Sequence, residues 1–172
     1  MKVYVDGTSF MNHLEAQGDT MAAGGGSEKD RQELARWFAR YAEHQDCDVI
    51  LVFDENPFGR TLPKHERYGK TKVINTPPGE NARAEIAGPA NRDAESERVY
   101  VVTDDGRLYS AVQNSPVRAY SPGKFLSKAR TLMRGKDELQ TEEPDEKYTG
   151  VSEDEVDFWL EMYKDEDQDE DL

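Results

Sequence analysis

The sequence predicts one α/β domain, a three-layer sandwich in which helices cover both faces of a mostly parallel central sheet. Three apolar runs, rich in β-branched and aromatic residues, indicate its strands: Val3–Val5, Val49–Phe53 and Val99–Val102. Continuous rather than alternating runs are typical of strands that are buried on both faces. Lys72–Asn75 and Val117–Tyr120 are weaker strand candidates. Helical patterns separate these runs, and strands that alternate with helices favour a parallel sheet.

Three helices are predicted between and after the strands. The first begins after Ser27, a favourable N-cap, and its apolar face is spaced i, i+3, i+4, i+7: Leu34, Trp37, Phe38 and Tyr41. Before it, residues 17–27 include three consecutive glycines and are expected to form a loop. A short helix is expected over residues 108–112, and a longer one begins at Pro122.

Charge divides the chain into two unequal parts. Residues 1–135, the predicted globular domain, contain 19 Lys and Arg and 19 Asp and Glu, and so have no net charge. Residues 136–172 contain 3 Lys and 17 Asp and Glu, which supply the whole net charge of −14. The acidic composition of the whole chain therefore does not exclude nucleic acid as a partner of the balanced domain.

The acidic part is predicted to consist of a linker (residues 136–150), an amphipathic helix (151–163) and a disordered tail (164–172). Ser152 and Glu155 form a capping-box pattern at the start of this helix. Two roles stay open for it. It either keeps the protein soluble, or it docks on a basic surface of its own chain or on a protein partner.

Composition excludes several classes of protein. No apolar run approaches the ~20 residues that a membrane span requires, so no membrane partner is expected. Cys47 is the only cysteine, which excludes a disulfide framework and a cysteine-cluster zinc site. The chain reaches Asp6 too soon for a signal peptide, and a cytoplasmic protein is expected.

Acidic residues follow each of the three strong strands: Asp6, then Asp54, then Asp104 and Asp105. The carboxyl ends of parallel strands lie on one edge of the sheet, where open α/β folds bind their ligands. Clustered carboxylates repel one another, and a hard divalent cation such as Mg²⁺ or Mn²⁺ relieves that repulsion. Such an ion can activate water against a phosphodiester. The alternative is structural, because Asp also caps helices and begins turns.

Other motifs for phosphate or acyl chemistry are missing. Asp6-Gly7-Thr8 resembles part of the haloacid-dehalogenase motif, but Tyr4 stands where that chemistry needs a nucleophilic Asp. Neither a P-loop nor a Gly-x-Ser-x-Gly elbow occurs in the sequence.

Five short motifs together resemble the YacP-like NYN domain ribonucleases of the PIN-like nuclease superfamily. They occur in order over residues 2–134: Val5-Asp6-Gly7, Val52-Phe53-Asp54, Gly79-Glu80-Asn81-Ala82, Val101-Val102-Thr103-Asp104-Asp105 and Ser121-Pro122-x-x-Phe125-Leu126. The resemblance implies a PIN-like parallel sheet between helices, Mg²⁺ or Mn²⁺ held by acidic residues, and RNA cleavage. Because some members act on ribosome-associated messenger RNA, it also implies such a substrate.

The resemblance assigns the catalytic role to Asp6 and Asp105, and a metal-binding role to these two together with Asp54 and Asp104. In the family's middle helix an acidic residue follows Thr-Ala, whereas this chain has Arg83 and Ala84 there. Glu80 or Glu85 is therefore a further candidate metal ligand. Gly88-Pro89 is expected to disturb this helix, because proline breaks a helix interior.

Basic and aromatic residues lie between Asp54 and the strand at Lys72, in what is expected to be a long loop at the active edge. Basic side chains bind phosphates and aromatic rings stack on unpaired bases, so single-stranded RNA is the expected partner. The candidate RNA-binding residues are Arg60, Lys64, Arg67, Tyr68 and Lys70.

Three functions remain after the sequence has been considered. The first is a metal-dependent endoribonuclease that hydrolyses single-stranded RNA. The second is an NYN-fold protein that binds RNA or the ribosome and has lost catalysis because of Arg83. The third is an interaction adaptor that acts through the acidic helix.

Overall fold

The computed structural model describes residues 1–54 and 62–141, with side chains described up to residue 135. Its sheet has six strands in the order β3-β4-β2-β1-β5-β6. The strands are β1 (Lys2–Asp6), β2 (Asp48–Phe53), β3 (His65–Tyr68), β4 (Thr71–Asn75), β5 (Val99–Val102) and β6 (Arg118–Tyr120). Only the β3–β4 hairpin is antiparallel among these strands; all the other pairs are parallel.

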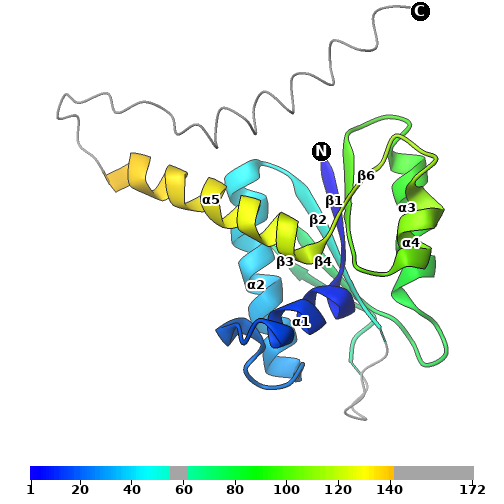
Figure 1. Cartoon of the computed structure of the whole chain (residues 1–172), viewed down its shortest axis with the longest axis horizontal. Helices are drawn as coiled ribbons and strands as arrows, with labels where there is room; N and C mark the ends of the chain where they lie inside the picture. The colour runs from blue at the N-terminus through cyan, green and yellow to red at the C-terminus, as the bar shows by residue number, and fades with distance from the viewer. Residues whose placement is uncertain (55–61, 142–172) are drawn as a thin grey trace, which may run out of the picture. The chain divides into compact units, whose positions relative to one another are not determined.

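Helices cover both faces of the sheet, which confirms the predicted three-layer α/β sandwich (Figure 1). The helices are α1 (Gly7–Ala16), α2 (Glu28–Gln45), α3 (Ala82–Asp93), α4 (Gly106–Val112) and α5 (Pro122–Thr141), with the short 3₁₀ helix η1 (Thr20–Ala22) after α1. On one side lie α1, α2 and α5, and on the other lie α3 and α4 (Figure 1).

Each face of the sheet has its own apolar core. The larger core packs Val3, Val5 and Leu51 against the aromatic side chains of α1, α2 and α5. The smaller core packs Tyr4, Val52 and Val101 against α3 and α4. Alternate residues of one strand thus lie in opposite cores. Both faces of these strands are therefore apolar, which explains the continuous apolar runs in the sequence.

The predicted helix after Ser27 is confirmed, with a capping box between Ser27 and Asp30. The structure adds α1, which the sequence did not predict. In fact Asp6 is the N-cap of α1, and its carboxylate accepts a hydrogen bond from the Ser9 N–H at 3.1 Å. The expected loop over residues 17–27 also contains η1.

Three other local predictions need correction. The expected long loop after Asp54 is wrong over residues 65–70, where β3 pairs with β4. Pro89 was expected to break the middle helix, but α3 continues to Asp93, because Ile86 and Ala90 are fully buried and hold it on the sheet. Finally, α5 extends to Thr141, through the first six residues of the expected linker over 136–150. The predicted acidic helix and tail lie outside the described residues.

No helix within the described ranges combines the length and the apolar composition that crossing a bilayer requires.

Gly7 allows α1 to begin directly against β2. A Cβ atom at this position would lie 2.6 Å from the ring of Phe53, which is 1% exposed, and 3.0 Å from the Val52 carbonyl oxygen. Gly106 has the same place in α4, one residue after the N-cap Asp105, yet a Cβ there would meet no atom within 4 Å. The two glycines therefore share a local motif but differ in packing.

We predict that Gly7→Ala lowers the free energy of unfolding by roughly 1–3 kcal/mol, because the added methyl group overpacks against a buried ring and a backbone carbonyl. Gly106→Ala is the matched control and should be neutral or slightly stabilising. Urea denaturation of the two variants measures the difference. Equal stability of the two variants would show that α1 does not need this close approach.

Candidate active site at the carboxyl edge of the sheet

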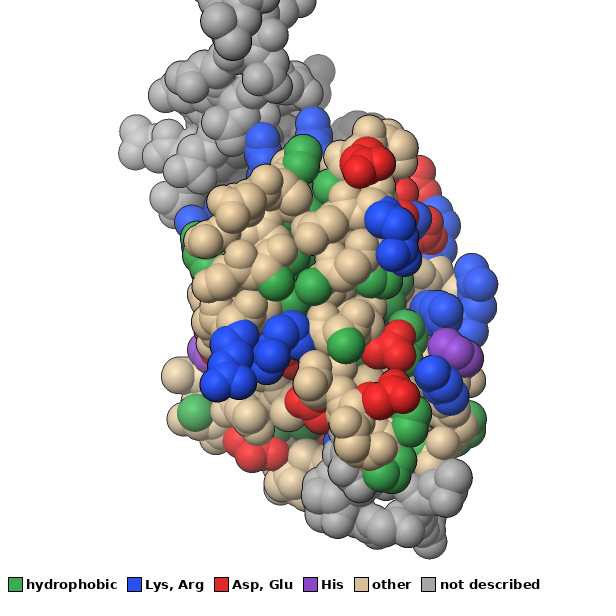
Figure 2. All heavy atoms as spheres, turned by 90° about the vertical axis from the view of Figure 1, so that its right-hand side faces the viewer, with side chains coloured by type: hydrophobic (Ala, Val, Ile, Leu, Met, Phe, Trp, Pro, Cys, Tyr) green, Lys and Arg blue, Asp and Glu red, His purple; other side chains and the backbone are tan. Residues whose placement is uncertain are grey.

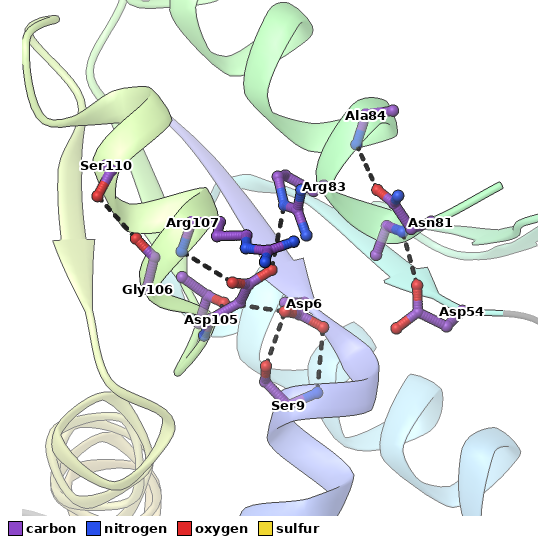
Figure 3. Close-up of polar contacts among 12 residues, drawn as sticks. Asp6, Ser9, Asp54, Asn81, Arg83, Ala84, Asp105, Gly106, Arg107 and Ser110 are labelled. Atoms are coloured by element: carbon purple, nitrogen blue, oxygen red, sulfur yellow. Dashed lines mark hydrogen bonds and ion pairs between the residues drawn. The ribbon is translucent and has the colours of Figure 1, made fainter.

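Asp6 ends β1 and is buried, with 5% of its surface exposed. Three groups donate hydrogen bonds to its carboxylate: the Ser9 N–H at 3.1 Å, the Ser9 hydroxyl at 2.7 Å and the Thr103 hydroxyl at 2.9 Å. Ser9 belongs to α1 (Figure 3). Thr103 follows β5. These three hydrogen bonds fix the orientation of the Asp6 carboxylate.

Thr103 connects Asp6 to Asp105. Its hydroxyl donates to Asp6 and accepts a hydrogen bond from the Asp105 N–H at 2.9 Å. The Thr103 N–H in turn donates to the carbonyl oxygen of Tyr120, at the end of β6. The carboxyl ends of β1, β5 and β6 are thus held together at the edge where the predicted catalytic pair lies.

Asp105 is half-buried and forms the N-cap of α4, where one carboxylate oxygen accepts the Arg107 N–H at 2.8 Å. Its other oxygen lies 3.2 Å from Nε of Arg83, which projects from the first turn of α3 (Figure 3). Partial burial raises the pKa of Asp105, but the Arg107 N–H and the Arg83 guanidinium outweigh it and hold that pKa below its usual value.

Asp54 follows β2 and has a different set of contacts. Its carboxylate accepts the Ala82 N–H at 2.7 Å, at the start of α3. Its backbone N–H donates to the Thr8 hydroxyl at 3.0 Å, and its carbonyl oxygen accepts a hydrogen bond from Arg31. Asp54 thus connects α1, α2 and α3 at the same edge of the sheet. Its carboxylate is hydrogen-bonded to the backbone of α3.

The remaining predicted ligands do not join this pair. Asp104 and Glu80 are exposed. Glu85 is half-buried, and its carboxylate lies 3.7 Å from the Lys64 ammonium group. Across residues 1–54 and 62–135, no group of three or more His, Cys, Asp or Glu side chains is arranged to hold a metal ion.

The donor chemistry of the central pair nevertheless fits a single hard cation. Asp6 and Asp105 offer carboxylate oxygens, the ligands that Mg²⁺ and Mn²⁺ prefer. Mg²⁺ is commonly held by one or two carboxylates, with water completing its octahedral shell. The two aspartates therefore suit one such ion, whereas the six-residue ligand set expected from the sequence is not assembled among the described residues.

The β3–β4 hairpin separates the candidate RNA-binding residues. Lys64 and the start of β3 lie at the carboxyl edge, because His65 pairs with Ile74 near the end of β4. The hairpin turn carries Arg67, Tyr68 and Lys70 away from it. Lys70 forms an ion pair with Asp46 at the opposite edge, Arg67 donates to the Gly69 carbonyl oxygen, and Tyr68 packs against the larger core. Arg60 lies outside the described residues.

Sequence reasoning missed the supporting residues Ser9, Thr103 and Arg31. Arg31 is half-buried, with its guanidinium 4.7 Å from the centre of the Phe53 ring and within hydrogen-bonding distance of the Asp54 carbonyl oxygen. Ser9 and Thr103 could have been found from their position, since each lies within three residues of a predicted catalytic aspartate. Arg31 gives no such signal, because only the fold brings it near Asp54.

A mostly parallel sheet between helices, with an aspartate pair at its carboxyl edge, is the arrangement that the resemblance to PIN-like nuclease domains implies. A family model described as "YacP-like NYN domain" matches residues 3–161, so the chain belongs to the YacP-like NYN domain family. This family membership indicates a nuclease or RNA-related function. The matched residues extend past the predicted domain boundary at 135 and include most of the predicted acidic helix.

Two solved structures of Rae1 (YacP) from Bacillus subtilis resemble this one. The first, of a mutant form, has a TM-score of 0.64 at 20% identity, over 84% of this chain and 86% of the other. The second has a TM-score of 0.60 at 20% identity, over 100% of this chain and 99% of the other. At this identity the likeness confirms the fold. No curated protein matches the chain.

We predict that Thr103→Val destabilises the protein by about 1–3 kcal/mol, because the buried Asp6 carboxylate loses a donor and the Asp105 N–H loses its acceptor. Thr103→Ser keeps the hydroxyl and should retain most of the stability. Thermal or urea unfolding measures both variants. Equal stability of the two variants would show that the Thr103 hydroxyl group does not stabilise the fold.

A second prediction concerns pH. Because folding lowers the pKa of Asp105, its charge contributes stability above the unfolded value of 3.8, and that stability is lost as the pH falls through the lower folded value. Asparagine also caps helices, so Asp105→Asn isolates the charge. Denaturant unfolding should show wild type more stable than this variant near pH 6, and the difference should shrink towards about pH 2. A difference independent of pH would contradict this.

Proposed function

We propose that this protein is a metal-dependent endoribonuclease that hydrolyses phosphodiester bonds of single-stranded RNA in the cytoplasm. The observation that carries the proposal is the link from Asp6 through Thr103 to Asp105. The Thr103 hydroxyl joins the Asp6 carboxylate to the backbone of Asp105 at the edge where open α/β sheets bind their ligands, which is more than two helix caps require. Membership of the YacP-like NYN family supports the same chemistry.

In this proposal Asp6 and Asp105 hold the Mg²⁺ or Mn²⁺ ion. When bound, such an ion acidifies a water nucleophile and stabilises the leaving oxygen. The role of the chain is to fix the two carboxylates before the ion arrives. Ser9 and Thr103 orient Asp6, and the first turn of α4 orients Asp105. Donors that are already in place lower the cost of reorganisation during the reaction.

Basic residues around the aspartate pair are suited to the RNA backbone. Arg83 contacts Asp105, Arg107 is exposed on the first turn of α4, and Lys64 lies at the edge on the β3 side. Figure 2 shows that on the side covered by α3 and α4, Lys and Arg side chains are interspersed with Asp and Glu rather than gathered in one continuous basic surface. We propose that Lys64, Arg83 and Arg107 contact phosphates, and that a messenger RNA on the ribosome is the substrate.

One observation favours a second function, that of a catalytically weakened protein that binds RNA or the ribosome. The Arg83 guanidinium already neutralises part of the charge of Asp105, and Asp54 is engaged by the backbone of α3. Such a protein would bind RNA without turnover and would not respond to a chelator. The same cleavage experiment separates the two functions.

We predict that the full chain cleaves single-stranded RNA when Mn²⁺ or Mg²⁺ is present, and that excess chelator stops the reaction. Asp6→Asn should lower the cleavage rate at least about 100-fold, because it removes a charged ligand without changing side-chain volume. Gel analysis of an end-labelled RNA measures the rate.

Asp48→Asn is the matched control, since Asp48 is exposed at the start of β2, on the opposite edge of the sheet. It should cleave RNA as the wild type does. RNA binding without metal-dependent cleavage in the wild type would refute the nuclease proposal and support the RNA-binding alternative.

A further inference from the structure

The Arg83–Asp105 pair places a positive charge of the protein on a carboxylate of the proposed metal site. Nε of Arg83 lies 3.2 Å from Oδ2 of Asp105. The side chains are 34% and 32% exposed, so the pair is neither fully solvated nor buried. A divalent cation and this guanidinium would therefore act on the same carboxylate.

The backbone around Arg83 is fixed by two contacts at the start of α3. The Asn81 side chain caps the helix by accepting the Ala84 N–H at 3.2 Å, and the Asp54 carboxylate accepts the Ala82 N–H at 2.7 Å (Figure 3). Arg83 lies between these two anchored residues. The backbone of Arg83 is therefore held in the first turn of α3, and its side chain extends from a fixed point.

We propose that Arg83 is a built-in counter-ion that competes with a divalent cation for Asp105 and so lowers the affinity of the site for that cation. The inference rests on the proposed function, since it takes Asp6 and Asp105 as the ligands. Arg83 is then a positioning residue, which acts on the ion through Asp105. Cation binding must displace the guanidinium or share one carboxylate with it, and either event costs part of the ion pair.

Arg107 provides a matched control on the neighbouring helix. It contacts Asp105 through its backbone N–H, which a side-chain substitution leaves in place. Its side chain is exposed. Arg107→Gln therefore removes the same unit of charge from the same edge of the sheet without removing the ion pair.

The test is calorimetric titration of Mn²⁺ into the full chain of the wild type, Arg83→Gln and Arg107→Gln. Each protein is also prepared with Asp6→Asn, because residues 136–172 contain 17 Asp and Glu, whose charge attracts cations independently of the site. The three proteins are compared only in the part of their Mn²⁺ binding that Asp6→Asn abolishes. Urea unfolding of every variant confirms that it is folded.

We expect Arg83→Gln to tighten this binding about fivefold, the upper range for a partly exposed ion pair. Arg107→Gln should stay within about twofold of the wild type. Equal or weaker Mn²⁺ binding by Arg83→Gln, or the same gain in both variants, would overturn the inference while leaving the metal site intact. If no variant bound Mn²⁺ in an Asp6-dependent way, the proposed function itself would fail.

Discussion

The hydroxyl group of Thr103 is the contact on which the arrangement of the edge depends. It donates to Asp6 and accepts from the backbone of Asp105, and so it joins the ends of β1 and β5 at the point where α1 and α4 begin. Asp6 and Thr103 are each 5% exposed, and a hydrogen bond left unmade by groups buried to this extent is costly. The sheet register supports the contact, since Val5 pairs with Val102, the residues just before Asp6 and Thr103.

The two aspartates combine a structural and a chemical role. Each is the N-cap of the helix that follows its strand, so the structural explanation for an Asp at this position is correct for both. Capping also positions the carboxylates, because the hydrogen bonds with the N–H groups of the helix end fix the orientation of each side chain. The structural role is therefore compatible with a catalytic one.

Much of the fold could be predicted because burial on both faces leaves a direct pattern in the sequence. The continuous apolar runs identify β1, β2 and β5, and the spacing from Leu34 to Tyr41 identifies α2. Helix α1 was missed because Asp-Gly is also a common turn pair, and the sequence does not show that the Asp6 side chain caps a helix. Pairing across the sheet is a long-range property, so the sequence could indicate that Asp6 and Asp105 share an edge but not that Glu85 is paired with Lys64.

The proposed function depends most on Asp6 and Asp105 sharing one divalent cation. Crystals soaked in Mn²⁺ and measured at a wavelength where manganese scatters anomalously would locate the ion directly. We expect one peak within about 2.0–2.3 Å of carboxylate oxygens of both aspartates, the range for a small divalent cation. A peak that contacts neither aspartate, or no peak near Thr103 while ions occupy other acidic residues, would contradict it.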